Sequence, residues 1–110
     1  MSSLPQTPYY AVIFTSKRVT EDSGYSDMAK KMEALSKEQN GFLGMQSARN
    51  ADGVGITVSY WRNLEDITKW KEHAEHIQAQ KSGKAEWYAG YEVRISKVER
   101  QYSLGNLESL

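Results

Sequence analysis

The sequence predicts an α+β domain of the ferredoxin-like class, in which two helices cover one face of a four-stranded antiparallel sheet. Three observations lead to this prediction. Four segments have the apolar, β-branched and aromatic composition of strands. Two segments between them repeat apolar residues at helical spacing. The order strand, helix, strand, strand, helix, strand, with right-handed crossovers, then places both helices on the same face.

The first strand and the first helix are predicted within residues 9–37. Residues 9–15 (YYAVIFT) are almost all apolar or aromatic and show no polar alternation, which is typical of a strand buried on both faces. In residues 24–37 apolar side chains recur at helical spacing, at Tyr25, Met28, Met32 and Leu35. Asn40-Gly41 is expected to end this helix.

A β-hairpin is predicted next. Residues 42–49 and 55–61 have strand composition, and Asn50-Ala51-Asp52-Gly53 separates them. Asn and Gly accept the positive φ angles that tight hairpin turns require. We therefore expect these two strands to be antiparallel neighbours.

The second helix and the last strand complete the order. Asn63 is a candidate N-cap, with Asp66 three residues later. The apolar stripe of the helix consists of Leu64, Ile67, Trp70, Ala74 and Ile77. Residues 81–83 are expected to interrupt the helix, and residues 84–88 to form a further turn. Residues 91–98 alternate as a half-exposed strand does.

Length and composition restrict the possible functions. The 110 residues suffice for one domain, expected at residues 9–100 between a flexible lead (1–8) and a tail (101–110). With 14 basic and 14 acidic residues the chain has no net charge, which speaks against nucleic-acid and anionic-membrane partners. It has no cysteine, so disulfides and thiolate metal sites are excluded. No secretion signal or membrane span is visible, and a cytoplasmic location is expected.

The composition of the first strand predicts a homodimer. Residues of both parities in 9–15 are large and apolar. The face of the sheet that carries no helix would then expose an apolar patch of roughly several hundred Å², which monomers rarely tolerate. A second copy related by a twofold axis is the usual solution.

One edge of the second helical stripe carries the candidate catalytic side chains. Lys69, His73, His76 and Gln80 form a column that would border a cavity between helix and sheet. Three interpretations remain for the histidines: a shared metal, exposed side chains without a role, or imidazoles that contact a ligand and shuttle protons. No acidic residue lies in the column, and no metal site is predicted.

Two other groups of residues have open interpretations. Trp61 and Trp70, at a strand end and on the helical stripe, fit either the core or a pocket wall. Arg49, at the end of the second strand, either binds an anionic group or lies in solvent.

The residues 41–45 (GFLGM), the segment 59–70 (SYWRNLEDITKW) and His76 resemble the antibiotic biosynthesis monooxygenase (ABM) domain family. The resemblance extends from Tyr9 to about Val98. It implies a homodimeric α/β barrel with a pocket between sheet and helices in each subunit. Some enzymes of this family oxidise polyketide aromatics without any cofactor, because the deprotonated substrate itself reduces dioxygen. Others degrade haem.

The haem-degrading members use three residues, of which this chain matches one. They have an Asn on the first strand, a Trp on the second helix and a His ten residues after that Trp. The corresponding residues here are Ser16, Trp70 and Gln80. Haem binding or degradation is therefore the weakest of the implied alternatives.

The leading hypothesis is a cofactor-independent monooxygenase acting on a small hydrophobic or aromatic compound. The expected catalytic residues are Trp70, His73 and His76. The expected substrate-binding residues are Tyr10, Phe14, Trp61, Trp70 and Gln80. The alternative is a non-catalytic domain, binding a small molecule or related to stress, in which side chains fill the pocket.

Overall fold

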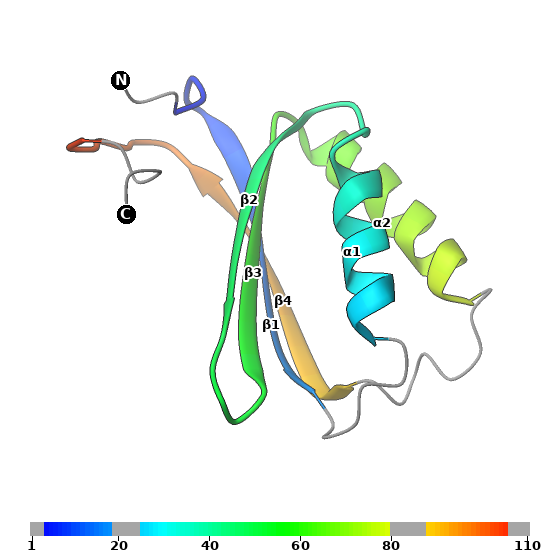
Figure 1. Ribbon diagram of the computed structural model, residues 1–110. Coiled ribbons are helices and arrows are strands. Elements are labelled where there is room, and N and C mark those ends of the chain that lie inside the picture. Colours follow the sequence, from blue (N-terminus) through cyan, green and yellow to red (C-terminus); the bar gives the residue numbers. More distant parts are fainter. Residues whose placement is uncertain (1–3, 19–24, 80–87, 106–110) are drawn as a thin grey trace.

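The computed structural model describes residues 4–18, 25–79 and 88–105 and has the predicted order of elements (Figure 1). The elements are β1 (Tyr9–Arg18), α1 (Tyr25–Ser36), β2 (Phe42–Arg49), β3 (Val54–Trp61), α2 (Leu64–Ala79) and β4 (Tyr88–Val98). The strands form one antiparallel sheet in the order β2-β3-β1-β4. Both helices lie on the same face of this sheet (Figure 1). The ferredoxin-like βαββαβ prediction is confirmed.

The central and last strands are longer than predicted. β1 continues through Ser16 and Lys17, and β4 begins at Tyr88, in the stretch expected to form a turn. The polar residues Ser16, Lys17 and Arg18 do not have the composition of a strand. Ser16 and Lys17 nevertheless pair with β3 on one side of β1 and with β4 on the other. Cross-strand pairing has overridden local propensity here. The predicted interruption at 81–83 and the residues 84–87 lie outside the described residues.

The hairpin between β2 and β3 has the predicted turn. The Asn50 side-chain oxygen accepts hydrogen bonds from the backbone N–H groups of Asp52 (2.9 Å) and Val54 (3.0 Å). Gly53 has a φ angle of 88°. Asparagine and glycine thus have the roles that their chemistry favours in such turns.

The start of α2 is held against the chain that precedes β2. The Asn63 side chain donates to the Asp66 carboxylate at 3.0 Å, and the Asn63 carbonyl accepts from the Ile67 N–H. Gly41 has a φ angle of 82°, and a Cβ atom there would lie 2.1 Å from an Asp66 carboxylate oxygen. The first glycine of the GFLGM segment is therefore required by its backbone conformation and by Asp66.

The core lies between the helices and the sheet. Trp61, Ile67 and Met28 are buried there. Leu64, expected on the apolar stripe of α2, is half-exposed because it lies in the first turn of that helix. In the described part of the chain, no helix has the length and apolarity needed to span a membrane.

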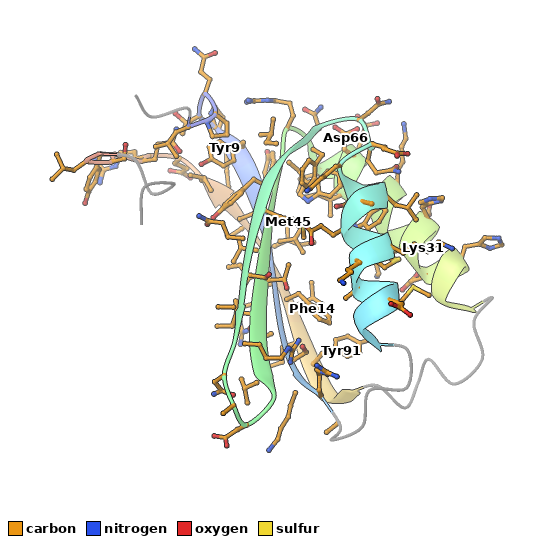
Figure 2. All side chains as sticks on the ribbon, viewed as in Figure 1. Tyr9, Phe14, Lys31, Met45, Asp66 and Tyr91 are labelled. Atoms are coloured by element: carbon orange, nitrogen blue, oxygen red, sulfur yellow. The ribbon has the colours of Figure 1, made fainter. Side chains whose placement is uncertain are left out.

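The opposite face of the sheet, here called the open face, is partly covered by the chain itself. Tyr9 and Ala11 are buried there. The Tyr9 hydroxyl donates to the Gln101 side chain at 2.5 Å, and its ring meets Tyr60 edge-on at a centroid distance of 5.9 Å. Figure 2 shows Tyr9 on the side of the sheet away from the helices. Part of the apolar patch expected on this face is thus covered by the chain itself.

Candidate functional site

The strand registers arrange the helix-facing side chains of the sheet in four rows, here called the floor. Ser36 of α1 donates to the Met45 sulfur at 3.9 Å, which places the Met45 side chain on the helix side. Figure 2 shows Phe14 and Tyr91 on that same side. From the tryptophan end to the hairpin end, the rows are Phe42–Trp61–Tyr10–Lys97, Met45–Ser59–Val12–Ile95, Ser47–Thr57–Phe14–Val93 and Arg49–Gly55–Ser16–Tyr91.

The tryptophan end of the floor is closed by its own side chains. Trp61 is fully buried, and its ring stacks on Trp70 at a centroid distance of 6.3 Å and an interplanar angle of 26°. Phe42 packs edge-on against Trp61 at 5.4 Å. The Trp61 indole N–H donates to the Ser59 hydroxyl at 2.9 Å, so its polar atom is satisfied. A ligand would have to displace Trp70 to reach Trp61.

The two candidate histidines lie on α2 beyond this stack. The His73 ring is 5.9 Å from the Trp70 ring, at an angle of 50°, and its side chain is exposed. His76 is also exposed, nearer the end of the helix. α2 runs from the tryptophan end of the sheet toward its hairpin end (Figure 1). The structure therefore brings His73 next to Trp70, whereas Gln80 lies outside the described residues.

A metal site would need at least three suitable side chains close together. Within residues 4–18, 25–79 and 88–105, no three His, Asp or Glu side chains gather in such a way. Glu65 and Glu72 of α2 are exposed, as are the two histidines.

Three floor residues of β4 are apolar and exposed by about half or more. On β4 the exposed fractions are 64% for Tyr91, 50% for Val93 and 52% for Ile95. The Tyr91 ring lies 5.4 Å from the Phe14 ring, tilted by 33°. Phe14 is half-buried and Tyr91 is exposed, so this aromatic pair lies where the buried part of the floor meets its exposed part. Tyr10, also half-buried, belongs to the row of Trp61 instead.

None of the residues expected in the site lies on β4. The alternation in residues 91–98 places Tyr91, Val93 and Ile95 on one face, and this signal was present in the sequence. The register that pairs Val93 with Phe14 was not, because the composition of two strands does not specify which of their residues lie opposite each other.

A shallow surface depression lies elsewhere, at the hairpin end of β2 and β3. Its volume is about 340 Å³, and it is lined by Ala48, Arg49, Asn50, Val54 and Ile56. Ile56 is five residues from Trp61 along β3, or about 17 Å at the usual rise of a strand. This depression is therefore not the pocket that was expected between α2 and the sheet.

Comparison with known proteins supports the expected family. The family described as Monooxygenase af470-like matches residues 13–99. The uncharacterised protein YqjZ of Bacillus subtilis is 48% identical over 101 residues, which cover 92% of this chain and 89% of YqjZ.

Solved structures share the fold at low sequence identity. SnoaB, a cofactor-independent oxygenase from Streptomyces nogalater, has a TM-score of 0.69 at 9% identity, with 84% of this chain and 95% of SnoaB covered. A candidate antibiotic biosynthesis monooxygenase from Nitrosomonas europaea has a TM-score of 0.68 at 15% identity, with 93% and 100% covered. These structures show the shared fold, and the family match over residues 13–99 shows that the chain belongs to the Monooxygenase af470-like family, which is of the antibiotic biosynthesis monooxygenase type.

Proposed function

We propose that this protein is a cofactor-independent monooxygenase that acts, as a cytoplasmic homodimer, on a small hydrophobic or aromatic compound. The observation that carries the proposal is the half-exposed apolar part of the floor, where Tyr91, Val93 and Ile95 lie on the strand beside the half-buried Phe14. A ligand covering these side chains gains about 25 cal/mol for each Å² of apolar surface removed from water. Membership of the family supports the reaction type.

The proposed reaction draws its electrons from the substrate. A base removes a proton from an activated CH₂ group or a phenol of the substrate, and the resulting anion reduces dioxygen. One oxygen atom becomes a carbonyl in place of two hydrogens and the other leaves as water, so that R₂CH₂ and O₂ give R₂CO and H₂O. The carbon loses four electrons and dioxygen gains four, so the balance needs no external reductant.

Residues on α2 would supply the base and part of the wall. His73 is the proposed proton acceptor because its ring lies beside Trp70 and an imidazole accepts protons near neutral pH. His76 is the second candidate for this role. Trp70 would form the wall that meets the substrate ring, and Phe14 would form part of the floor.

Dioxygen uptake with a panel of quinols, phenols and polyketide-like aromatics tests this function. We expect uptake with the wild type, and its loss in Trp70→Ala and His73→Ala. Trp70→Phe keeps an aromatic ring on Trp61 and controls for loss of folding, and Lys31→Ala, on the exposed surface of α1, is the matched control. Absence of uptake with every compound would contradict the oxygenase proposal.

A non-catalytic binding domain is the second candidate. The stack of Phe42, Trp61 and Trp70 favours it, because these rings fill the tryptophan end of the layer between sheet and helices. Binding of a panel compound, seen as quenching of tryptophan fluorescence, without any dioxygen uptake would support this alternative.

A further inference from the structure

One basic side chain is held flat against the floor at its hairpin end. Arg49 pairs with Gly55, and its guanidinium lies over that glycine, where a Cβ atom would come within 2.6 Å of the Arg49 Cζ atom. The guanidinium donates to the Gly53 carbonyl and, at 3.4 Å, to the Ser16 hydroxyl. The absence of a side chain at position 55 therefore determines where this charge lies.

The same row of the floor leads from the arginine to the exposed aromatic pair. Ser16 is buried and pairs with Gly55 on one side and Tyr91 on the other. The guanidinium lies over Gly55 on β3 and reaches toward Ser16 on β1, so it is between one and two strand spacings, roughly 5–10 Å, from the strand that carries Tyr91. A cation and an exposed aromatic surface thus share one half of the floor.

The charges on the floor are all of one sign. Glu92 is the only acidic residue within the four strands, and its side chain lies on the open face, where it pairs with Arg94 at 3.2 Å. The charged side chains in the four floor rows are Arg49 and Lys97. A surface that combines apolar side chains with charges of one sign favours a ligand of the opposite charge.

We propose that Arg49, positioned by Gly55 and Ser16, forms an anion subsite for an aromatic ligand whose ring lies on Phe14 and Tyr91. The ligand class is an aromatic compound with an anionic oxygen group, such as a carboxylate, sulfonate or phenolate, because a guanidinium donates charge-assisted hydrogen bonds to such groups. The inference rests on the proposed function in taking this ligand to be the substrate, whose anionic oxygen Arg49 would hold while the substrate reduces dioxygen.

Two fluorescent probes that differ mainly in charge test the subsite. The anionic probe is 8-anilinonaphthalene-1-sulfonate, and its uncharged analogue is N-phenyl-1-naphthylamine. We expect Arg49→Gln to weaken binding of the sulfonate about tenfold, as loss of a charge-assisted hydrogen bond does, and to change binding of the uncharged probe less than about twofold. Arg100→Gln removes the same charge from an exposed position after β4 and should change neither.

A second variant moves the charge without removing it. Gly55→Ala places a Cβ atom against the flexible end of the Arg49 side chain, so the fold can tolerate it while the guanidinium shifts. We expect the same selective loss for the sulfonate probe. Gly90→Ala is the matched control, because nothing lies within 4 Å of a Cβ atom there.

Three outcomes would overturn the proposal: no binding of the sulfonate probe, an equal effect of Arg49→Gln on both probes, or no effect on either. A selective effect in a protein that consumes no dioxygen would leave the subsite standing and remove the proposed reaction. Dioxygen uptake with no selective effect of Arg49→Gln would remove the subsite alone.

Discussion

At the scale of single residues, Gly41 connects a backbone conformation to a side-chain contact. Its φ angle of 82° and the distance of only 2.1 Å that would separate a Cβ atom there from an Asp66 carboxylate oxygen both oppose any other residue. We expect Gly41→Ala to lower the free energy of unfolding by about 1–3 kcal/mol, measured by urea denaturation. The double variant with Asp66→Ala removes the two closest contacts and keeps only the Asp66 Cβ atom, at 2.9 Å, so the combined loss should be less than additive, and a fully additive loss would contradict this account.

Tyr9 makes the stability of the protein depend on pH in the alkaline range. Burial raises the pKa of its hydroxyl above the ordinary value, the nearby Tyr60 raises it further, and Arg62 lowers it. The unfolded chain therefore releases this proton first, and the Tyr9 contribution to stability is lost as pH rises above about 10. We expect Tyr9→Phe to cost about 1 kcal/mol at pH 8, through the bond to Gln101, and less at pH 10.5.

Denaturant titrations at the two pH values measure this difference. Tyr102→Phe, in an almost fully exposed side chain, is the control and should change stability at neither pH. A Tyr9→Phe deficit that is the same at both pH values would show that the Tyr9 proton does not contribute.

At the scale of elements, the β2–β3 hairpin depends on the side chain of Asn50. Its carbonyl oxygen accepts two backbone hydrogen bonds that close the turn. We expect Asn50→Ala to cost about 1–2 kcal/mol, seen as a lower urea midpoint with an unchanged m-value. Asp52→Ala, in the same turn, should cost much less, because Asp52 contributes its backbone N–H to this bonding. Equal losses in the two variants would show that the Asn50 side chain has no special role.

The elements also show how much of the molecule can be predicted from sequence. The hairpin, both helices and the order of strands follow from local patterns, such as Asn50 and Gly53 in the turn. The exposed apolar part of the floor cannot be predicted from local patterns, because it depends on which residues lie opposite each other across the sheet. Nothing local indicates that Gly55 lies between Arg49 and Ser16, or that Val93 faces Phe14. From the sequence, Trp61 and Trp70 fit either the core or a pocket wall. Only the contacts in the structure show that Trp61 is fully buried.

At the scale of the whole molecule, the two faces of the sheet differ in what still lies exposed. On the helix side the exposed apolar residues are on β4, as Val93 shows. On the open face Tyr9 and Ala11 are covered, whereas Ile13 and Val58 are half-buried and Ile56 is 47% exposed. The apolar surface left for a second copy is therefore centred on β1 and β3, toward the hairpin.

This arrangement makes the proposed homodimer testable with two matched substitutions. Ile56→Glu puts a carboxylate into the centre of the proposed interface, where burial of a charge is costly, and we expect it to shift the protein to monomer in sedimentation velocity. Val93→Glu introduces the same charge at a β-branched residue that is equally exposed, at 50% against 47%, but on the other face, and should leave the dimer intact. A wild type that sediments as a monomer, or dissociation by both variants alike, would contradict an interface on the open face. Because both positions are about half exposed within one chain, neither change should unfold the subunit, so the comparison reports on association alone.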